Sequence, residues 1–178
     1  MRYCRVLSVL VLLLITACGE LVTPTPKPIA VDKVEMITVY SKGGEEIIRL
    51  GDRRFTELAE QLLATLPNFN LPAGCVFSEN EVSARKAKDK LVELLFKVPE
   101  RVTIGELIPK EERARILTDE QGFRVLEVQT AILVLSGEYR GHVFLPSDGE
   151  PPTWGCWSME KEKEIDTHWV EAVEKALE

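Results

Sequence analysis

The sequence predicts an α+β protein, in which an antiparallel β-sheet is packed by two main amphipathic helices at about residues 53–66 and 160–177. Two observations support this fold class. Apolar residues recur with helical spacing in those two segments. Most of the remaining chain consists of short β-rich runs separated by turn sequences, without the regular strand–helix alternation that builds a parallel sheet.

The first β-rich region is residues 34–50, VEMITVYSKGGEEIIRL, which places two runs around Gly43-Gly44, a dipeptide suited to a tight hairpin. The helix that follows is predicted by apolar residues at i, i+3, i+4, i+7, i+8 and i+11. These residues are Phe55, Leu58, Ala59, Leu62, Leu63 and Leu66. Asp52 is expected to cap the start of this helix, and Pro67 is expected to end it.

Residues 78–98 support two interpretations. Ser78 and Glu81 resemble a capping box, which indicates the start of a helix. Val92, Leu94, Phe96 and Val98 instead alternate with polar residues in the manner of a strand. We therefore expect a short helix or loop to about residue 89 and a strand from residue 91. Pro99 should bend the chain into a second extended piece at residues 102–107.

Residues 116–145 are expected to form an antiparallel meander with turns at 119–122 and 136–138. Residues 131–135 are apolar at every position, so their strand should be central and covered on both faces. The sequence PSDGEPPTWGC that follows predicts a loop. The last helix is predicted by apolar residues along one face, namely Ile165, Trp169, Val170, Val173, Ala176 and Leu177.

Residues 1–17 have the features of an export signal. Arg2 and Arg5 give the start a positive charge, and residues 6–16 are almost entirely apolar. This run is shorter than the about 20 residues that a membrane-spanning helix needs. Its length, its flanking charge and the small residues at its end are typical of a secretory signal.

The segment Ile15-Thr16-Ala17-Cys18 resembles the lipobox of bacterial lipoproteins, which is an aliphatic residue, a small residue, Gly, Ala or Ser, and then Cys. The resemblance implies that the Cys18 thiol receives a diacylglyceryl group, that the bond after Ala17 is cut, and that Cys18 becomes the new N-terminus. Acyl chains such as palmitate would then hold the exported protein at the cell membrane, or at the outer membrane if the organism has one. The alternatives are an uncleaved anchor and a secreted protein with an incidental cysteine.

This interpretation divides the chain into a signal peptide (1–17), a lipidated cysteine with a proline-rich tether (18–32), and a single α+β domain (33–178). Three prolines lie within the sequence LVTPTPKPI at residues 21–29. Proline-rich chain stays extended at ~3.1 Å per residue, so the tether could hold the domain some ~35–40 Å from the lipid.

The charge of the chain argues against nucleic acid as a partner. Residues 1–17 contain two arginines and no acidic residue, so their removal changes the formal net charge from −7 to −9. A surface this acidic repels phosphate backbones. It also gives no attraction to anionic lipids, so attachment to the membrane would depend on the acyl chains.

The four cysteines are expected to have different roles. Cys4 leaves with the signal and Cys18 carries lipid, which leaves Cys75 and Cys156 in a protein exported to an oxidising compartment. Such a pair predicts a disulfide bond. The bond would close a loop of about 80 residues and stabilise the fold by about 4 kcal/mol in the chain-entropy model. Both cysteines follow glycine, in PAGC and WGCW, which suggests a bond between two loops. Two separate buried thiols are the alternative, and no metal or cofactor site is predicted.

No catalytic motif is present, and two weaker features remain. His142 lies on an expected strand near Glu138, and a structural role for this histidine is the alternative to catalysis. Trp154 and Trp157 flank Cys156 in the expected loop, where exposed aromatic rings commonly bind sugars or protein partners. Their alternative is that both rings pack over the disulfide and the sheet edge.

We therefore expect a membrane-anchored binding or envelope-assembly module without enzymatic activity, with a glycan or a protein of the envelope as partner. A cell-envelope hydrolase with a site near His142 and Glu138 is the alternative. It requires both side chains to face a cleft that has a hydroxyl or thiol within reach.

Overall fold

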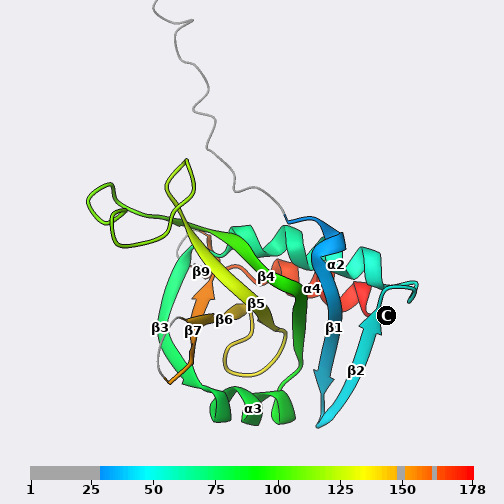
Figure 1. Ribbon diagram of the computed structural model, residues 1–178. Coiled ribbons are helices and arrows are strands. Elements are labelled where there is room, and N and C mark those ends of the chain that lie inside the picture. The colour runs from blue at the N-terminus through cyan, green and yellow to red at the C-terminus, as the bar shows by residue number, and fades with distance from the viewer. Residues whose placement is uncertain (1–28, 148–150, 162–163) are drawn as a thin grey trace, which may run out of the picture.

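A curved, seven-stranded antiparallel β-sheet forms the body of the protein (Figure 1). The computed structural model describes residues 29–147, 151–161 and 164–178. The strand order across the sheet is β2-β1-β4-β5-β6-β7-β3. The predicted α+β class is confirmed, although three helices rather than two pack on the sheet.

Most strands of the sheet are neighbours of the strand that precedes them in the chain, and β3 is the main exception. The elements are η1 (Val31–Lys33), β1 (Val34–Ser41), β2 (Gly44–Arg49), α2 (Phe55–Thr65), η2 (Leu66–Asn68), β3 (Leu71–Ser78), α3 (Glu79–Lys88), β4 (Leu91–Leu107), β5 (Phe123–Val134), β6 (His142–Ser147), β7 (Thr153–Ser158), β8 (Glu160–Lys161), β9 (Glu164–Ile165) and α4 (His168–Ala176).

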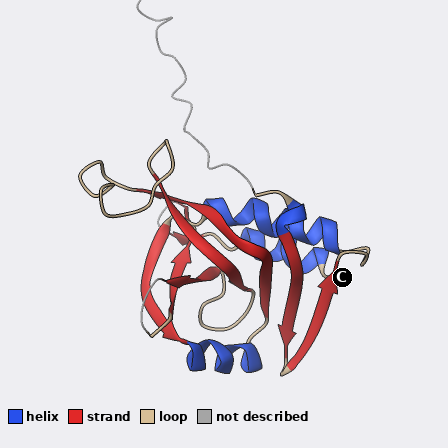
Figure 2. Cartoon of the chain, viewed as in Figure 1, coloured by secondary structure: helices blue, strands red, loops and turns tan. Residues whose placement is uncertain are grey.

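Helices α2 and α4 pack together over one face of the sheet, as Figure 2 shows. A large apolar cluster, which we call the α2–α4 core, fills the space between them and the strands. Its fully buried members include Leu58 and Leu62 from α2, Val170 and Val173 from α4, and Ile37, Leu94 and Leu133 from the strands.

Helix α3 packs on the opposite face of the sheet. It contacts β3, which is an edge strand, and also β1, which is next to the other edge. The sheet must therefore curl so that one helix of ten residues reaches both sides. The apolar cluster beneath this helix, which we call the α3 core, consists of Phe77, Val82, Leu91, Ile132, Val134, Phe144, Trp154 and Cys156.

The predicted central strand is confirmed. β5 is the fourth of seven strands, and residues 131–135 are all buried. Ala131, Leu133 and Leu135 enter the α2–α4 core, whereas Ile132 and Val134 enter the α3 core. The strand is apolar at every position because successive side chains point to opposite faces and both faces are covered.

The predicted hairpin is confirmed, but its turn begins one residue earlier than expected. Ser41 pairs with Gly44, which leaves Lys42 and Gly43 as a two-residue turn. Both have positive φ, at 51° and 76°, as a type I′ turn requires.

Helix α2 confirms the predicted helix at 53–66, but its start differs in detail. The residue at the N-cap position is Arg54, and Asp52 contributes by accepting the Arg54 backbone N–H at 2.8 Å. At the other end, Pro67 lies in the 3₁₀ turn η2, which follows the helix directly.

The ambiguous region resolves as expected, with α3 ending at Lys88 and a strand from Leu91. Ser78 and Glu81 form the predicted capping box: the Ser78 hydroxyl accepts the Glu81 N–H, and the Glu81 carboxylate accepts the Ser78 N–H. Pro99 does not divide the strand, because β4 absorbs it at a register irregularity between Leu95 and Glu100.

Two sequence predictions are wrong. The last helix begins at His168 rather than at residue 160, because residues 160–161 and 164–165 pair as the short strands β8 and β9. The expected loop at 146–156 includes the first part of β7, which pairs with β3. Turn residues mark β3, but β3 is an edge strand, and an edge strand tolerates proline and glycine where a central strand does not.

Candidate binding surface at the β4–β5 arm

Strands β4 and β5 extend beyond the rest of the sheet as a two-stranded arm (Figure 1). β4 pairs with β1 only up to Phe96, and β5 pairs with β6 only at residues 132–133. Among the described strands, residues 100–107 and 123–128 therefore pair with each other, and Arg124 also forms an isolated bridge with Thr118. We call residues 100–128, including the loop between the two strands, the arm.

The base of the arm is packed against the end of α2. Val102 and Ile104 are fully buried in the α2–α4 core. The Gly105 N–H donates to the Phe69 carbonyl oxygen at 2.7 Å. A Cβ at Gly105 would lie 2.9 Å from the Pro67 carbonyl oxygen, so only glycine permits this approach. The arm is therefore fixed in direction relative to the sheet.

The tip of the arm is ordered by its own hydrogen bonds. Asp119 Oδ1 accepts the backbone N–H groups of Gln121, Gly122 and Phe123 at 2.9, 2.8 and 2.9 Å. This Asp-centred turn confirms the turn predicted at 119–122. Because Asp119 is committed to backbone donors, it holds the shape of the tip and is a poor candidate for direct ligand chemistry.

Apolar side chains are exposed along the arm. Leu107 and Leu117 are 59% and 50% exposed, and Val98, just before the arm, is 54% exposed. These are three of the eight large apolar residues that are exposed in the described part of the chain. Two of them lie on the arm itself, where they give the projecting element apolar surface that a partner could contact.

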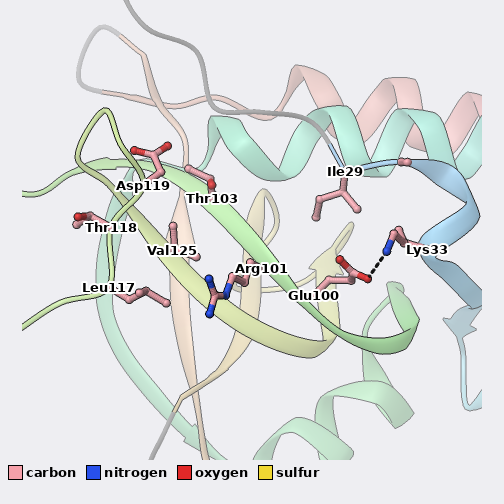
Figure 3. Close-up of a pocket in the computed structure, with 10 residues that line it drawn as sticks. Ile29, Lys33, Glu100, Arg101, Thr103, Leu117, Thr118, Asp119 and Val125 are labelled. Atoms are coloured by element: carbon pink, nitrogen blue, oxygen red, sulfur yellow. Dashed lines mark ion pairs between the residues drawn. The ribbon is translucent and has the colours of Figure 1, made fainter.

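A cleft of about 490 Å³ separates the arm from the beginning of the described chain (Figure 3). Its lining combines apolar, hydroxyl and charged side chains: Ile29, Ala30, Lys33, Glu100, Arg101, Thr103, Leu117, Thr118, Asp119 and Val125. Lys33 and Glu100 form an ion pair at 3.2 Å on one side of the cleft.

Arg101 is the charged group of this cleft that is most available to a ligand. Its side chain is 71% exposed, and its contact with Glu127 is long, at 3.9 Å. The guanidinium can therefore turn towards a carboxylate of a bound molecule at little cost. Together with Leu117 and Val125, it gives the cleft one cationic and one apolar element, which suits an extended peptide better than a compact polar ligand.

A second cleft, of about 650 Å³, lies along the same part of β5 and shares Leu117 and Val125 with the first. Its other lining residues are Pro99, Arg115, Ile116, Arg124, Leu126, Glu127 and Gln129. Arg124 is held across the arm by Glu106, whose carboxylate accepts the Arg124 Nη2 hydrogen bond at 3.1 Å. The arm is thus hollowed at two places.

His142 and Glu138, the residues of the alternative hydrolase site, lie in different environments. His142 is 7% exposed, and its Nδ1 is 3.0 Å from the Tyr139 carbonyl oxygen. Glu138 is 71% exposed and pairs with Arg85 at 3.4 Å. The imidazole is thus buried beside a backbone carbonyl, and this geometry does not pair it with the Glu138 carboxylate.

Trp154 and Trp157 do not form an exposed platform, because each is only 8% exposed. Trp154 packs in the α3 core and its Nε1 donates to Glu79 at 2.7 Å. Trp157 points to the other face and packs in the α2–α4 core, with its ring against Gly155. The alternative placed both rings over the disulfide and the sheet edge. Both rings are packed, but only Trp154 shares a cluster with Cys156, and the ligand contacts expected at the two tryptophans find no support in these positions.

Cys75 and Cys156 lie side by side on the neighbouring strands β3 and β7. Both are free thiols in the structure, and they belong to the same apolar cluster. Burial raises the pKa of the Cys156 thiol well above its usual range, and the contact with Cys75 adds to this. Their expected location in two loops is wrong, whereas the disulfide itself stays a prediction.

Cys18 and the leader lie outside the described residues, so lipid attachment also stays a prediction. Within residues 29–147, 151–161 and 164–178, no helix is both long and apolar enough to span a membrane. Over the same ranges, no group of three or more His, Cys, Asp and Glu side chains is placed to hold a metal ion.

Comparison of the chain with protein-family models, with curated proteins and with solved structures finds no match. The site is therefore interpreted from its own geometry.

Sequence reasoning missed the arm as a functional element. The alternation of Val102 and Ile104 with polar residues correctly indicates a strand that is buried on one face. Its projection depends on the lengths of its neighbours: β4 has 17 residues and β5 has 12, whereas β1 has eight and β6 has six. No local pattern encodes that difference.

Proposed function

We propose that this protein is an exported lipoprotein, held at a membrane by acyl chains on Cys18, and that its domain is a non-enzymatic binding or assembly module. In this proposal the arm is the surface that contacts a protein partner of the cell envelope. The observation that carries the proposal is the arm itself: a fixed, two-stranded projection with exposed apolar residues and two clefts.

A protein partner suits this surface better than a glycan. Sugars are commonly bound by exposed aromatic rings, and the two tryptophans considered for that role are buried. The arm offers instead Leu107, Leu117 and the exposed cation Arg101. Apolar anchors beside an arginine are characteristic of protein recognition surfaces.

The start of the domain supports a role close to the anchor. Ile29 and Ala30, where the described chain begins, line the same cleft as the arm. In Figure 1 the arm projects from the end of the sheet opposite α3, and the described chain begins at that end. A tether that joins the domain beside the arm keeps the arm on the membrane-proximal half of the domain.

The anchor is tested by comparing the exported full chain with Cys18→Ala by intact-mass analysis. We expect the parent to begin at residue 18 and to carry the mass of a diacylglyceryl group, whereas the variant lacks this group. Exported chains that begin at the same residue and differ in mass only by the Cys-to-Ala substitution would refute the anchor. This result would not decide the role of the arm, which is tested separately by crosslinking.

The arm is tested by placing a photo-crosslinking amino acid at Leu107 or Leu117 in the full chain in its native membrane. Leu50 is the matched control, because it is 78% exposed but lies after β2 at the far edge of the sheet. We expect discrete protein adducts from both arm positions and none from Leu50. We also expect Arg101→Glu to reduce the arm adducts, since it reverses the charge of the cleft.

Two outcomes would contradict the role of the arm. One is the same adducts from Leu50 as from Leu107, which would indicate random collisions. The other is no adduct from either arm position while the protein is abundant in the membrane. Competition of the adducts by purified envelope glycan would favour a glycan in place of the protein partner.

A further inference from the structure

We infer that Cys75 and Cys156 form a thiol–disulfide site with a fixed order of reaction: Cys75 reacts first with an oxidant disulfide, and Cys156 then displaces it to close the internal bond. The inference concerns the β3–β7 edge of the sheet rather than the arm, and it does not depend on the proposed function.

The first support is the register of β3 on β7, which places Cys75 opposite Cys156 beside a β-bulge. The pairs Ser78–Thr153, Phe77–Trp154 and Val76–Gly155 continue in the same register to Cys75 and Cys156. Pro72 pairs with Trp157 and Val76 pairs with Gly155, so three residues of β3 oppose only Cys156 on β7. Such a bulge re-aims side chains and weakens the local ladder. The two thiols share one face of the sheet and one apolar cluster.

Gly74 makes this bulge possible. Its φ is +69°, a left-handed conformation that other residues adopt only with strain. A Cβ at Gly74 would meet nothing within 4 Å, so the position selects glycine for backbone conformation and not for space. The register shift beside Cys75 therefore contains a residue whose backbone conformation favours glycine.

The second support is the unequal access to the two sulfurs. Cys75 is half-buried on β3, an edge strand whose outer side has no neighbour in the sheet, and the adjacent Val76 is 65% exposed. Cys156 is 3% exposed on β7, between β6 and β3. An oxidant that arrives from solvent reaches Cys75 and not Cys156.

The third support is the environment of Cys156. Burial raises the pKa of its thiol, which disfavours the reactive thiolate and makes Cys156 the less reactive of the two towards an oxidant from solvent. The Arg85 guanidinium, which lies 4.8 Å from the centre of the Phe77 ring and 4.3 Å from that of Tyr139, opposes this effect. A thiol of this kind is suited to the second step, in which the target is already in contact.

The reaction balances as two exchanges. The Cys75 thiolate attacks one sulfur of a low-molecular-weight disulfide such as glutathione disulfide. A mixed disulfide forms, and the released thiolate takes up the proton that Cys75 gave up. Cys156 then loses its proton and attacks the Cys75 sulfur, which releases the second small thiol. In total, two protein thiols are oxidised and one small disulfide is reduced to two thiols.

The bond would join β3 to β7 at the place where the strand ladder is interrupted. The disulfide would therefore attach an edge strand covalently to the sheet, because among the described strands β3 pairs only with β7. The reduced form leaves that edge dependent on the few pairs at either end of the bulge.

The test adds glutathione disulfide to the reduced full chain and follows each cysteine by peptide mapping, which reports Cys4 and Cys18 on separate peptides. We expect the parent to give the linked Cys75–Cys156 peptides. Cys156→Ser should accumulate glutathione on Cys75. In Cys75→Ser, glutathione should appear on Cys156 at least ~10-fold more slowly, because the buried thiol is shielded.

Gly74→Ala tests the bulge, and Gly51→Ala is its matched control. Gly51 also has a positive φ, +107°, and open space around its Cβ position, but it lies far from the thiols in the sequence. We expect Gly74→Ala to accumulate the mixed disulfide on Cys75, since the second step loses its alignment. Gly51→Ala should close the internal bond as the parent does.

Alkylation with iodoacetamide tests the parent protein itself and therefore does not depend on whether a variant folds. We expect Cys75 to react faster than Cys156. The inference is overturned if Cys156 reacts first in either assay. It is also overturned if the parent stops at the mixed disulfide, which would mean that the two sulfurs do not meet.

Discussion

The two faces of the sheet are stabilised in different ways. The α2–α4 core contains 27 buried apolar residues, contributed by two helices and most strands. The α3 core contains eight, and Val82 is the only buried residue that α3 itself contributes. Around this smaller core lie ion pairs and stacked rings: Lys86 pairs with Glu93 at 2.9 Å, and Arg85 lies over Tyr139.

The difference shows that helices on the two faces of one sheet can be held in place by different kinds of interaction. α2 and α4 are held by the burial of apolar area, which depends little on pH or charge. α3 buries too little area for that, so polar and cation–π contacts must supply part of its attachment. The α3 side should therefore respond to pH, charge substitution and oxidation, and the α2–α4 side should respond mainly to changes of volume.

Truncation of a buried leucine should have the largest effect and can be compared across one strand. Leu94 and Leu91 are both fully buried on β4, but Leu94 enters the α2–α4 core and Leu91 enters the α3 core. We expect Leu94→Ala to lower the free energy of unfolding by about 4 kcal/mol and Leu91→Ala by about 2.5 kcal/mol. The α3 core is bordered by half-exposed residues that can move into a cavity. Denaturant unfolding measures both, and equal losses would contradict the comparison.

Removal of the Arg85 charge should come next. Its guanidinium is 3.7 Å from Asp89, a carboxylate with only 7% exposure, and it also covers two aromatic rings. Arg85→Met keeps apolar volume but leaves Asp89 without this partner, so we expect a loss of about 2 kcal/mol. Lys88→Met, on an exposed position of the same helix, should change the free energy of unfolding by less than about 0.5 kcal/mol. Similar losses for both variants would show that Arg85 has no special role.

Tyr40 should make the α3 side sensitive to alkaline pH. Burial, together with the hydrogen bond that its hydroxyl donates to Glu93 at 2.6 Å, raises the Tyr40 pKa well above its usual range. Its contribution is therefore fully present below about pH 10, where the unfolded tyrosine titrates, and is lost as the pH rises above that value. We expect Tyr40→Phe to cost about 1 kcal/mol at pH 7. The difference from the parent should shrink in unfolding experiments above pH 10, and a constant difference would contradict this account.

The capping box of α3 should give the smallest effect, at acid pH. The Ser78 backbone N–H and hydroxyl hold the pKa of Glu81 below its usual value. The stabilisation that Glu81 provides is present above the unfolded pKa and is lost as the pH falls through the lower folded value. In an NMR titration, Ser78→Ala should move the Glu81 midpoint upwards, because one donor is removed. An unchanged midpoint would show that the hydroxyl has no part in the cap.

The sequence by itself determined the elements that depend on neighbours in the chain. The helix at Phe55–Thr65, the capping box at Ser78 and the turn around Asp119 are all encoded within a few residues. The burial of residues 131–135 was also predictable, since a strand that is apolar at every position has to be covered on both faces. In each case the local preference and the final structure agree.

Only the tertiary structure decided the features that join distant segments. It paired β3 with β7, and so buried Trp154 and Trp157 and placed Cys75 beside Cys156 on two strands where the sequence suggested loops. It also left the arm projecting, because β4 and β5 are longer than the strands beside them. In the segments around Cys75 and Cys156, the glycines and prolines predict turns when only the neighbouring residues are considered. Their final conformation depends on which edge of the sheet remains free, and that is decided when the whole sheet assembles.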